Sequence, residues 1–120
     1  MRVAVTAQGR ELGSPVDPRF GRAKFFVVVD METSEFSVAD NSQNLNAAQG
    51  AGIQAGRNVV ALGAEAVLTG HVGPKAFKTL QAGGVAVYTS ATGSVADAIE
   101  QFKAGRLKQS TGADVEGHWV

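Results

Sequence analysis

A short segment near the start of the chain places two arginines on either side of an aromatic residue. The residues are Arg19, Phe20, Gly21 and Arg22. Two guanidinium groups, each a planar fork of N–H donors, suit an anion with a polarisable face when they stand beside an aromatic ring. The alternative is a surface loop in which Phe20 fills the core, the arginines are solvated, and Asp17 pairs with one of them. The residues alone leave both interpretations open.

A second segment combines glycines with a histidine and a lysine. Its residues, within the stretch TGHVGPK, are Gly70, His71, Gly73, Pro74 and Lys75. The segment leaves a predicted strand and enters a predicted helix, so free main-chain N–H groups and the positive end of the helix dipole face outward. The glycines let a ligand approach the main chain closely. The pattern indicates an anion cradle or, alternatively, an ordinary strand-to-helix turn, and it lacks the GxxxxGK[ST] signature of a phosphate loop.

A third segment, 40–50, is rich in amide side chains, which both donate and accept hydrogen bonds and so suit a ligand of mixed polarity. From this segment Asn46, Gln49 and Gly50 are candidate binding residues, whereas Asn41 and Asn44 are better explained by turn formation and helix capping.

Other kinds of site find little support. The chain has no cysteine, which excludes disulfides, cysteine-held iron–sulfur clusters and cysteine-type zinc sites. His71 and His118 are far apart in the sequence, so His71 is better interpreted as a donor to an anion than as a metal ligand. Asp17, Asp30 and Asp40 are the candidate carboxylates, but the latter two flank a predicted hairpin. No GxSxG, HExxH or EF-hand pattern occurs, and we predict that the protein is not an enzyme.

The composition of the chain limits the classes of molecule that the protein is expected to bind. The 120 residues fit one domain, and eleven basic against eleven acidic residues give a formal net charge of zero. This balance removes any general electrostatic case for nucleic acid or an anionic membrane. No apolar run is long enough to span a bilayer, and the start lacks a signal-peptide pattern, so we expect a cytoplasmic protein that binds neither nucleic acid nor membrane.

The elements that would position these loops follow from hydrophobic periodicity and from breaker residues. Predicted strands cover 2–6, 23–30, 35–39, 66–68 and 85–88, and predicted helices cover 50–62, 74–83 and a segment that begins after Ser94 and ends at Gly105. The second and third strands should form an antiparallel hairpin. The order β-β-β-α-β-α-β-α predicts a single α/β domain over residues 1–107, with a mixed five-stranded sheet, flanking helices and a flexible tail over 108–120. The three loops should converge at the carboxyl ends of the parallel strands.

Three longer segments carry a family resemblance. They are VDPRFGRAKFFVVVD (16–30), the stretch 50–77 and the stretch 83–107. In this order they resemble the dinitrogenase iron–molybdenum cofactor biosynthesis proteins, and RFGRA and TGxxGPKAF are the most specific strings. The resemblance implies a ribonuclease H-like fold without nuclease function. It also implies a carrier, insertion aid or storage protein for molybdenum- or iron-containing sulfide clusters.

The resemblance assigns site residues only where the motifs match. Residues 19–22 match RFGR, and Gly70, Gly73, Pro74 and Lys75 match the second motif. Many members have a histidine where this chain has Gln49. The implied ligand is therefore an anionic molybdenum–sulfide cluster that carries its own sulfide ligands, most closely a molybdenum–copper cluster and as second choice an iron–molybdenum one. Arginine, lysine and main-chain N–H donors would hold it, with no metal ligand from the protein.

Two other functions remain open at this point. The first is a cluster-free regulatory or protein-interaction module of the same fold, whose partners the sequence does not identify. The second is a metal-dependent hydrolase, which needs several carboxylates converging on a divalent cation. The spacing of the acidic residues does not supply such a set.

Overall fold

The computed structural model describes residues 1–41 and 51–111 and forms one α/β unit built on a mixed sheet. The strands are β1 (Arg2–Ala7), β2 (Phe25–Asp30), β3 (Phe36–Asp40), β4 (Ala66–Leu68), β5 (Ala86–Thr89) and β6 (Lys108–Gln109), and the helices are the 3₁₀ turn η1 (Phe20–Arg22), α1 (Ala51–Ala61), α2 (Pro74–Ala82) and α3 (Val95–Lys103). The strand order is β3-β2-β1-β4-β5-β6. Within the described ranges, no helix has the length and apolar character needed to cross a membrane.

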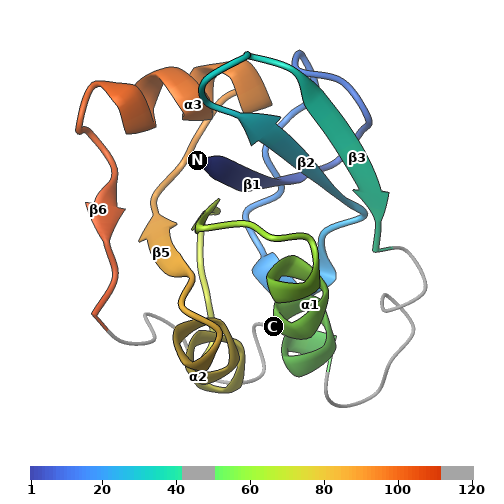
Figure 1. The fold of residues 1–120 in the computed structure, drawn as a ribbon, viewed down its shortest axis with the longest axis vertical. Coiled ribbons are helices and arrows are strands. Elements are labelled where there is room, and N and C mark those ends of the chain that lie inside the picture. Colours follow the sequence, from blue (N-terminus) through green and yellow to red (C-terminus); the bar gives the residue numbers. More distant parts are fainter. Residues whose placement is uncertain (42–50, 112–120) are drawn as a thin grey trace.

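The sheet lies between two helical layers (Figure 1). Helices α1 and α2 cover one face, and α3 covers the other. Alternate residues of the buried strands serve the two layers, because successive side chains of a strand point to opposite faces. Ala4 of β1 packs toward α1 and α2, whereas Val3 and Val5 pack with Val95 and Ile99 of α3. The near-continuous apolar sequence of β1 and β2 therefore reflects burial on both faces.

The predicted single α/β domain, its mixed sheet and the antiparallel hairpin of β2 and β3 are confirmed. The predicted count of five strands is wrong, because the sheet has six. The additional strand, β6, pairs antiparallel with β5 and begins in the segment expected to be a tail. It has only two residues, both polar and exposed, so no hydrophobic pattern marks it. Residues 112–120, including His118, lie outside the described residues.

The long loop after β1 is fastened to the start of α3. The main-chain N–H groups of Val95 and Ala96 donate to the carbonyl oxygens of Ser14 (2.9 Å) and Leu12 (2.8 Å). The N–H of Val16 donates to the carbonyl of Gly93 at 2.9 Å. The first N–H groups of a helix have no partner inside the helix, so the loop supplies acceptors that α3 would otherwise lack. These bonds order a loop that contains no regular element before η1.

A capping box begins α3. The Ser94 hydroxyl accepts from the N–H of Asp97 (3.1 Å), and the Asp97 carboxylate accepts from the N–H of Ser94 (3.0 Å). We expect Ser94→Ala to lower the free energy of unfolding by about 1 kcal/mol, because one helix N–H loses its acceptor. Urea denaturation would measure this loss. Ser94→Thr, which keeps the hydroxyl, is the matched control, and an equal loss in both variants would contradict the capping explanation.

Candidate functional site

The two loops that carry the most specific motifs meet at the carboxyl edge of the parallel strands β1 and β4. Arg19 and His71 form an isolated parallel bridge. The N–H of His71 donates to the carbonyl of Pro18 (2.8 Å), and the N–H of Phe20 donates to the carbonyl of His71 (3.2 Å). The predicted convergence is therefore confirmed for these two loops. The third predicted loop, with Asn44, Asn46, Gln49 and Gly50, falls in 42–50, outside the described residues.

Gly70 is the point of closest contact between the two loops. A Cβ built on Gly70 would lie 2.7 Å from both the Cα and the carbonyl oxygen of Pro18. Real side chains do not approach a main chain that closely, so this position admits only glycine. The sequence alone predicts that this glycine lets a ligand approach the main chain. In the structure the space is taken by Pro18, so Gly70 joins the loops and does not expose main chain to an anion.

Phe20 anchors the arginine-bearing loop in the core. Its side chain is fully buried, and its ring centroid lies 5.7 Å from that of Phe26. Gly21 is buried beside it in η1. The ring therefore offers no face to a ligand, in contrast to the expectation that it would stand beside the guanidinium groups at a binding surface. Its packing instead fixes the positions of Arg19, which precedes η1, and Arg22, which is the last residue of η1.

An open groove of about 600 Å³ adjoins this anchored loop. Its lining residues are Gln8, Asp17, Pro18, Arg19, Arg22 and Lys24. Three of the six are cationic and one is acidic. Arg19 and Lys24 are exposed, and within ranges 1–41 and 51–111 neither side chain makes an ion pair or hydrogen bond. The groove thus combines a positive lining with donors that a ligand can use.

Three of these residues, Gln8, Pro18 and Lys24, are not among the binding candidates that the sequence alone indicates. Lys24 follows Arg22 by two positions and adds a third positive charge within residues 19–24, which is the signal that could have identified it. Gln8 is exposed directly after β1, where the parallel strand ends. Strand ends of this kind are the usual place for ligands in open α/β sheets.

Asp17 connects the groove to β1 through hydrogen bonds. Its carboxylate oxygen Oδ1 accepts from the main-chain N–H of Arg19 at 3.0 Å. The Thr6 hydroxyl donates to the carbonyl of Asp17 (2.7 Å), and a second hydrogen bond of 2.9 Å joins it to the buried hydroxyl of Thr69. Burial raises the pKa of the Asp17 carboxyl, against the opposing effects of the Arg19 N–H and of the positive charges of Arg19 and Lys24.

The remaining residues of the second motif lie at the start of α2. Gly73 is the N-cap without a side-chain cap, Pro74 occupies the first helical turn, and Lys75 is exposed. Pro at this position costs no hydrogen bond, since its N–H would have no helical partner. These three residues do not line the groove. The helix start, with its exposed Lys75, is therefore not part of the groove.

The carboxylates considered as metal ligands have structural roles. Asp30 Oδ1 accepts from the N–H groups of Glu32 (2.8 Å) and Thr33 (3.3 Å), and these bonds lower the pKa of Asp30. Asp40 forms an ion pair with Arg10 at 3.6 Å. In the part of the chain that the structure describes, no group of three or more His, Cys, Asp or Glu side chains is arranged to hold a metal ion.

The amide of Asn41 has a structural role, but not the turn formation or helix capping expected from the sequence. It is fully buried, and its Nδ2 donates to the carbonyl of Ala23 at 2.8 Å. This bond joins the end of β3 to the residues before β2. Asn41 therefore closes the open end of the hairpin.

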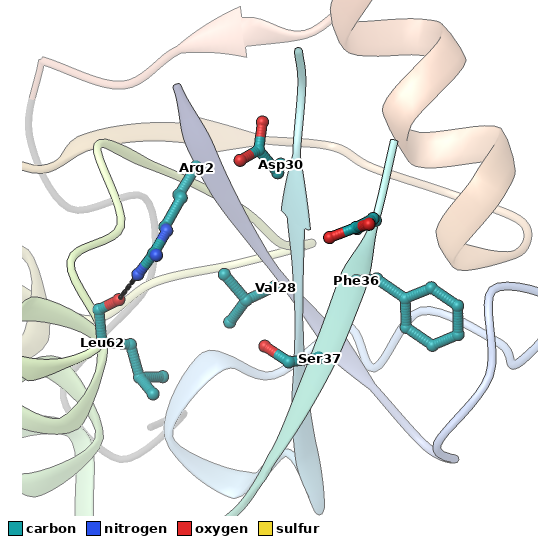
Figure 2. Close-up of a pocket in the computed structure, with 7 residues that line it drawn as sticks. Arg2, Val28, Asp30, Phe36, Ser37 and Leu62 are labelled. Carbon is teal, nitrogen blue, oxygen red and sulfur yellow. Dashed lines mark hydrogen bonds between the residues drawn. The ribbon is translucent and has the colours of Figure 1, made fainter. Parts of the chain in front are cut away.

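A second hollow, of about 250 Å³, lies at the opposite end of β1 (Figure 2). Arg2 extends across it and donates to the carbonyl of Leu62 at 3.3 Å. Asp30 and Glu35 add two carboxylates, and Val28 is part of the floor. One cation against two carboxylates makes this hollow a poor anion site, so the groove beside Arg19 is the candidate.

Known proteins resemble the chain over nearly its whole length. Residues 1–105 match the sequence pattern of the dinitrogenase iron–molybdenum cofactor family. The apo form of the orange protein from Desulfovibrio gigas is 43% identical, covers 95% of this chain and 96% of its own, and superposes with a TM-score of 0.92. A putative NifB protein from Thermotoga is 38% identical with a TM-score of 0.84, covering 97% of this chain and 98% of its own.

A more distant relative is an uncharacterized protein of Methanocaldococcus jannaschii. It is 27% identical over 111 residues, which are 91% of each chain. The family match includes the whole groove and both motif loops, since all of them lie before residue 76. The chain belongs to the dinitrogenase iron–molybdenum cofactor family.

Proposed function

We propose that this protein binds an anionic metal–sulfide cluster without a covalent bond and carries or stores it. The observation that carries the proposal is the groove lined by Arg19, Arg22 and Lys24 on a loop that Phe20 and Gly70 hold in place. Family membership supports the proposal, because the family is described by the iron–molybdenum cofactor of dinitrogenase. The protein acts by binding alone, with no catalytic step.

The chemistry of the lining suits a cluster that brings its own ligands. Guanidinium and ammonium groups donate hydrogen bonds to sulfide and neutralise negative charge, but they do not ligate metals. Sulfide already satisfies soft metals such as copper and molybdenum, so no protein thiolate is required. Our first candidate is the molybdenum–copper sulfide cluster that the family resemblance of the sequence implies, with an iron–molybdenum cluster second.

Reconstitution tests the proposal directly. Anaerobic addition of tetrathiomolybdate and copper to the purified protein should produce a visible absorption band that stays with the protein through gel filtration. Raising the salt concentration should weaken retention, because exposed charges are screened more strongly. A colourless protein whose amide NMR signals around the groove do not shift would refute the proposal. A colourless protein that captures a partner from native extract would favour the interaction module instead.

The cytoplasmic location and the ribonuclease H-like classification of the fold stay predictions from the sequence. The same holds for the direct contribution of Gly73, Pro74 and Lys75 to binding. Chemical-shift mapping during the reconstitution would test that contribution, because a ligand that reaches the start of α2 should shift the amide signals of Lys75 and Ala76.

A further inference from the structure

A single acidic side chain lies among the cations of the groove. Of the described residues that line it, only Asp17 is acidic, and that residue is 6% exposed. A carboxylate in this place opposes any anion that enters. Burial also disfavours its charged form, as the raised pKa of Asp17 reflects. A site that binds anions and keeps a buried carboxylate in its lining needs an explanation for that charge.

The fold uses the shape of Asp17 rather than its charge. Oδ1 accepts one hydrogen bond from the N–H of Arg19, which the amide oxygen of an asparagine would accept equally. The other two bonds are made by its main chain. Its N–H donates to the carbonyl of Thr6 at 2.9 Å, and its carbonyl accepts from the Thr6 hydroxyl. These three hydrogen bonds therefore do not require the negative charge of Asp17, which acts instead on the cations Arg19 and Lys24 of the groove lining.

The effect of that charge depends on the charge of the ligand. Coulomb repulsion between a fixed carboxylate and a bound anion grows in proportion to the anion's charge and falls with distance. A compact, highly charged anion such as sulfate concentrates its charge at the lining. A large sulfide cluster spreads its charge over many atoms, most of them farther from Asp17, so it is opposed less.

We propose that Asp17 is a specificity-determining residue: its carboxylate makes the binding free energy of the groove less favourable in proportion to ligand charge, which disfavours compact oxyanions and keeps the bound cluster releasable. The inference rests on the proposed anion binding and deepens it. Without Asp17, three cations at one groove would favour the anions of highest charge density, among which sulfate and phosphate are common. With Asp17 the lining still has more positive than negative charge, but a high charge density on the ligand raises its affinity less than it would without the carboxylate.

Two tetrahedral anions of the same shape and different charge test this inference. Tetrathiomolybdate is a dianion and tetrathioperrhenate is a monoanion. Asp17→Asn removes the charge and keeps the acceptor for Arg19, so it should raise the affinity for the dianion about tenfold and for the monoanion about threefold, since the repulsion scales with charge. Sulfate should also compete better against the variant. Glu32→Gln, an exposed acid outside the groove, should change neither affinity.

A second variant tests the inference without a substitution at the buried Asp17. Gln8 is exposed and lines the groove, so Gln8→Glu adds a second carboxylate without disturbing the core. It should lower the affinities by the same two factors, about tenfold for the dianion and threefold for the monoanion. Spectrophotometric titration of each variant with each anion supplies the values, and thermal unfolding confirms that each variant is folded.

The outcomes separate the two proposals. If the wild-type protein binds neither anion, the proposed function fails and this inference fails with it. If the wild-type protein binds both anions, but Asp17→Asn and Gln8→Glu change the two affinities by equal factors or not at all, the inference about Asp17 is overturned and the binding function stands. If Asp17 had a purely structural role, Asp17→Asn would lower the affinity for both anions by the same factor.

Discussion

Replacing both Arg19 and Arg22 by alanine should lower the affinity for tetrathiomolybdate at least about 100-fold. A hydrogen bond to a charged group contributes about 1.5–3 kcal/mol, and about 1.4 kcal/mol corresponds to tenfold in affinity. The loss of two such groups from a groove with three cations leaves Lys24 alone. The domain should remain folded, because Arg19 is exposed and the burial of Phe20 continues to anchor the loop.

A matched control has the same change in net charge. Arg57 and Arg106 are exposed arginines that do not line the groove, so Arg57→Ala with Arg106→Ala should leave the affinity within about twofold, the level expected for screened, distant charges. Equilibrium titration and thermal unfolding of both double variants would measure binding and folding separately. If the two double variants lose affinity equally, only the net charge matters, and the groove is not the site.

The Arg19→Lys, Arg22→Lys variant asks whether geometry matters beyond charge. Lysine keeps the positive charge but presents a compact ammonium instead of a planar fork of donors. Its affinity should fall between those of the wild type and of the alanine variant. This intermediate result would show that directed hydrogen bonds add to the Coulomb attraction.

Gly70→Ala should have the largest effect on stability among the substitutions discussed. The new Cβ would lie 2.7 Å from main-chain atoms of Pro18, which cannot rotate away as a flexible side chain would. The two loops must therefore separate, and overpacking of this kind costs about 1–3 kcal/mol. Urea denaturation should show this loss, and anion affinity should fall as well, because Arg19 follows Pro18 directly and its bridge to His71 would be disturbed.

Gly13 provides the comparison within the same chain. A Cβ at Gly13 meets no atom within 4 Å, so Gly13→Ala should change the free energy of unfolding by no more than about 0.5 kcal/mol. If Gly13→Ala and Gly70→Ala prove equally mild, the contact between Gly70 and Pro18 does not hold the loops together.

The sequence predicts the sheet and its helices well where burial imposes a pattern. The strands of residues 2–6 and 66–68 and the helix starting at Pro74 coincide closely with β1, β4 and α2, because apolar runs and a proline at the first turn are local signals. β6 escapes prediction because its two polar residues gain order only from pairing with β5. Such pairing depends on the fold as a whole and leaves no local trace.

The candidate site is predictable in part for the same reason. RFGR and TGHVGPK identify two loops, but the sequence does not show which residues pack against each glycine or aromatic ring. Gly70 makes room for Pro18, and Phe20 fills the core, where sequence reasoning left a ligand role open. Asp17 and Lys24 join the groove through the path of the loop between β1 and β2. These contacts become visible only once the chain is folded.

The bonds between the long loop and α3 have a consequence for the order of events during synthesis. The acceptors at Leu12 and Ser14 receive their donors from Ala96 and Val95, which lie near the other end of the described chain. All six residues that line the groove precede α3 in the sequence, yet the hydrogen bonds that fasten the long loop to α3 cannot form until α3 has emerged. Contacts between residues so far apart in sequence form late. Under the proposed function, a cluster could therefore be bound in the completed groove only after α3 has been synthesised.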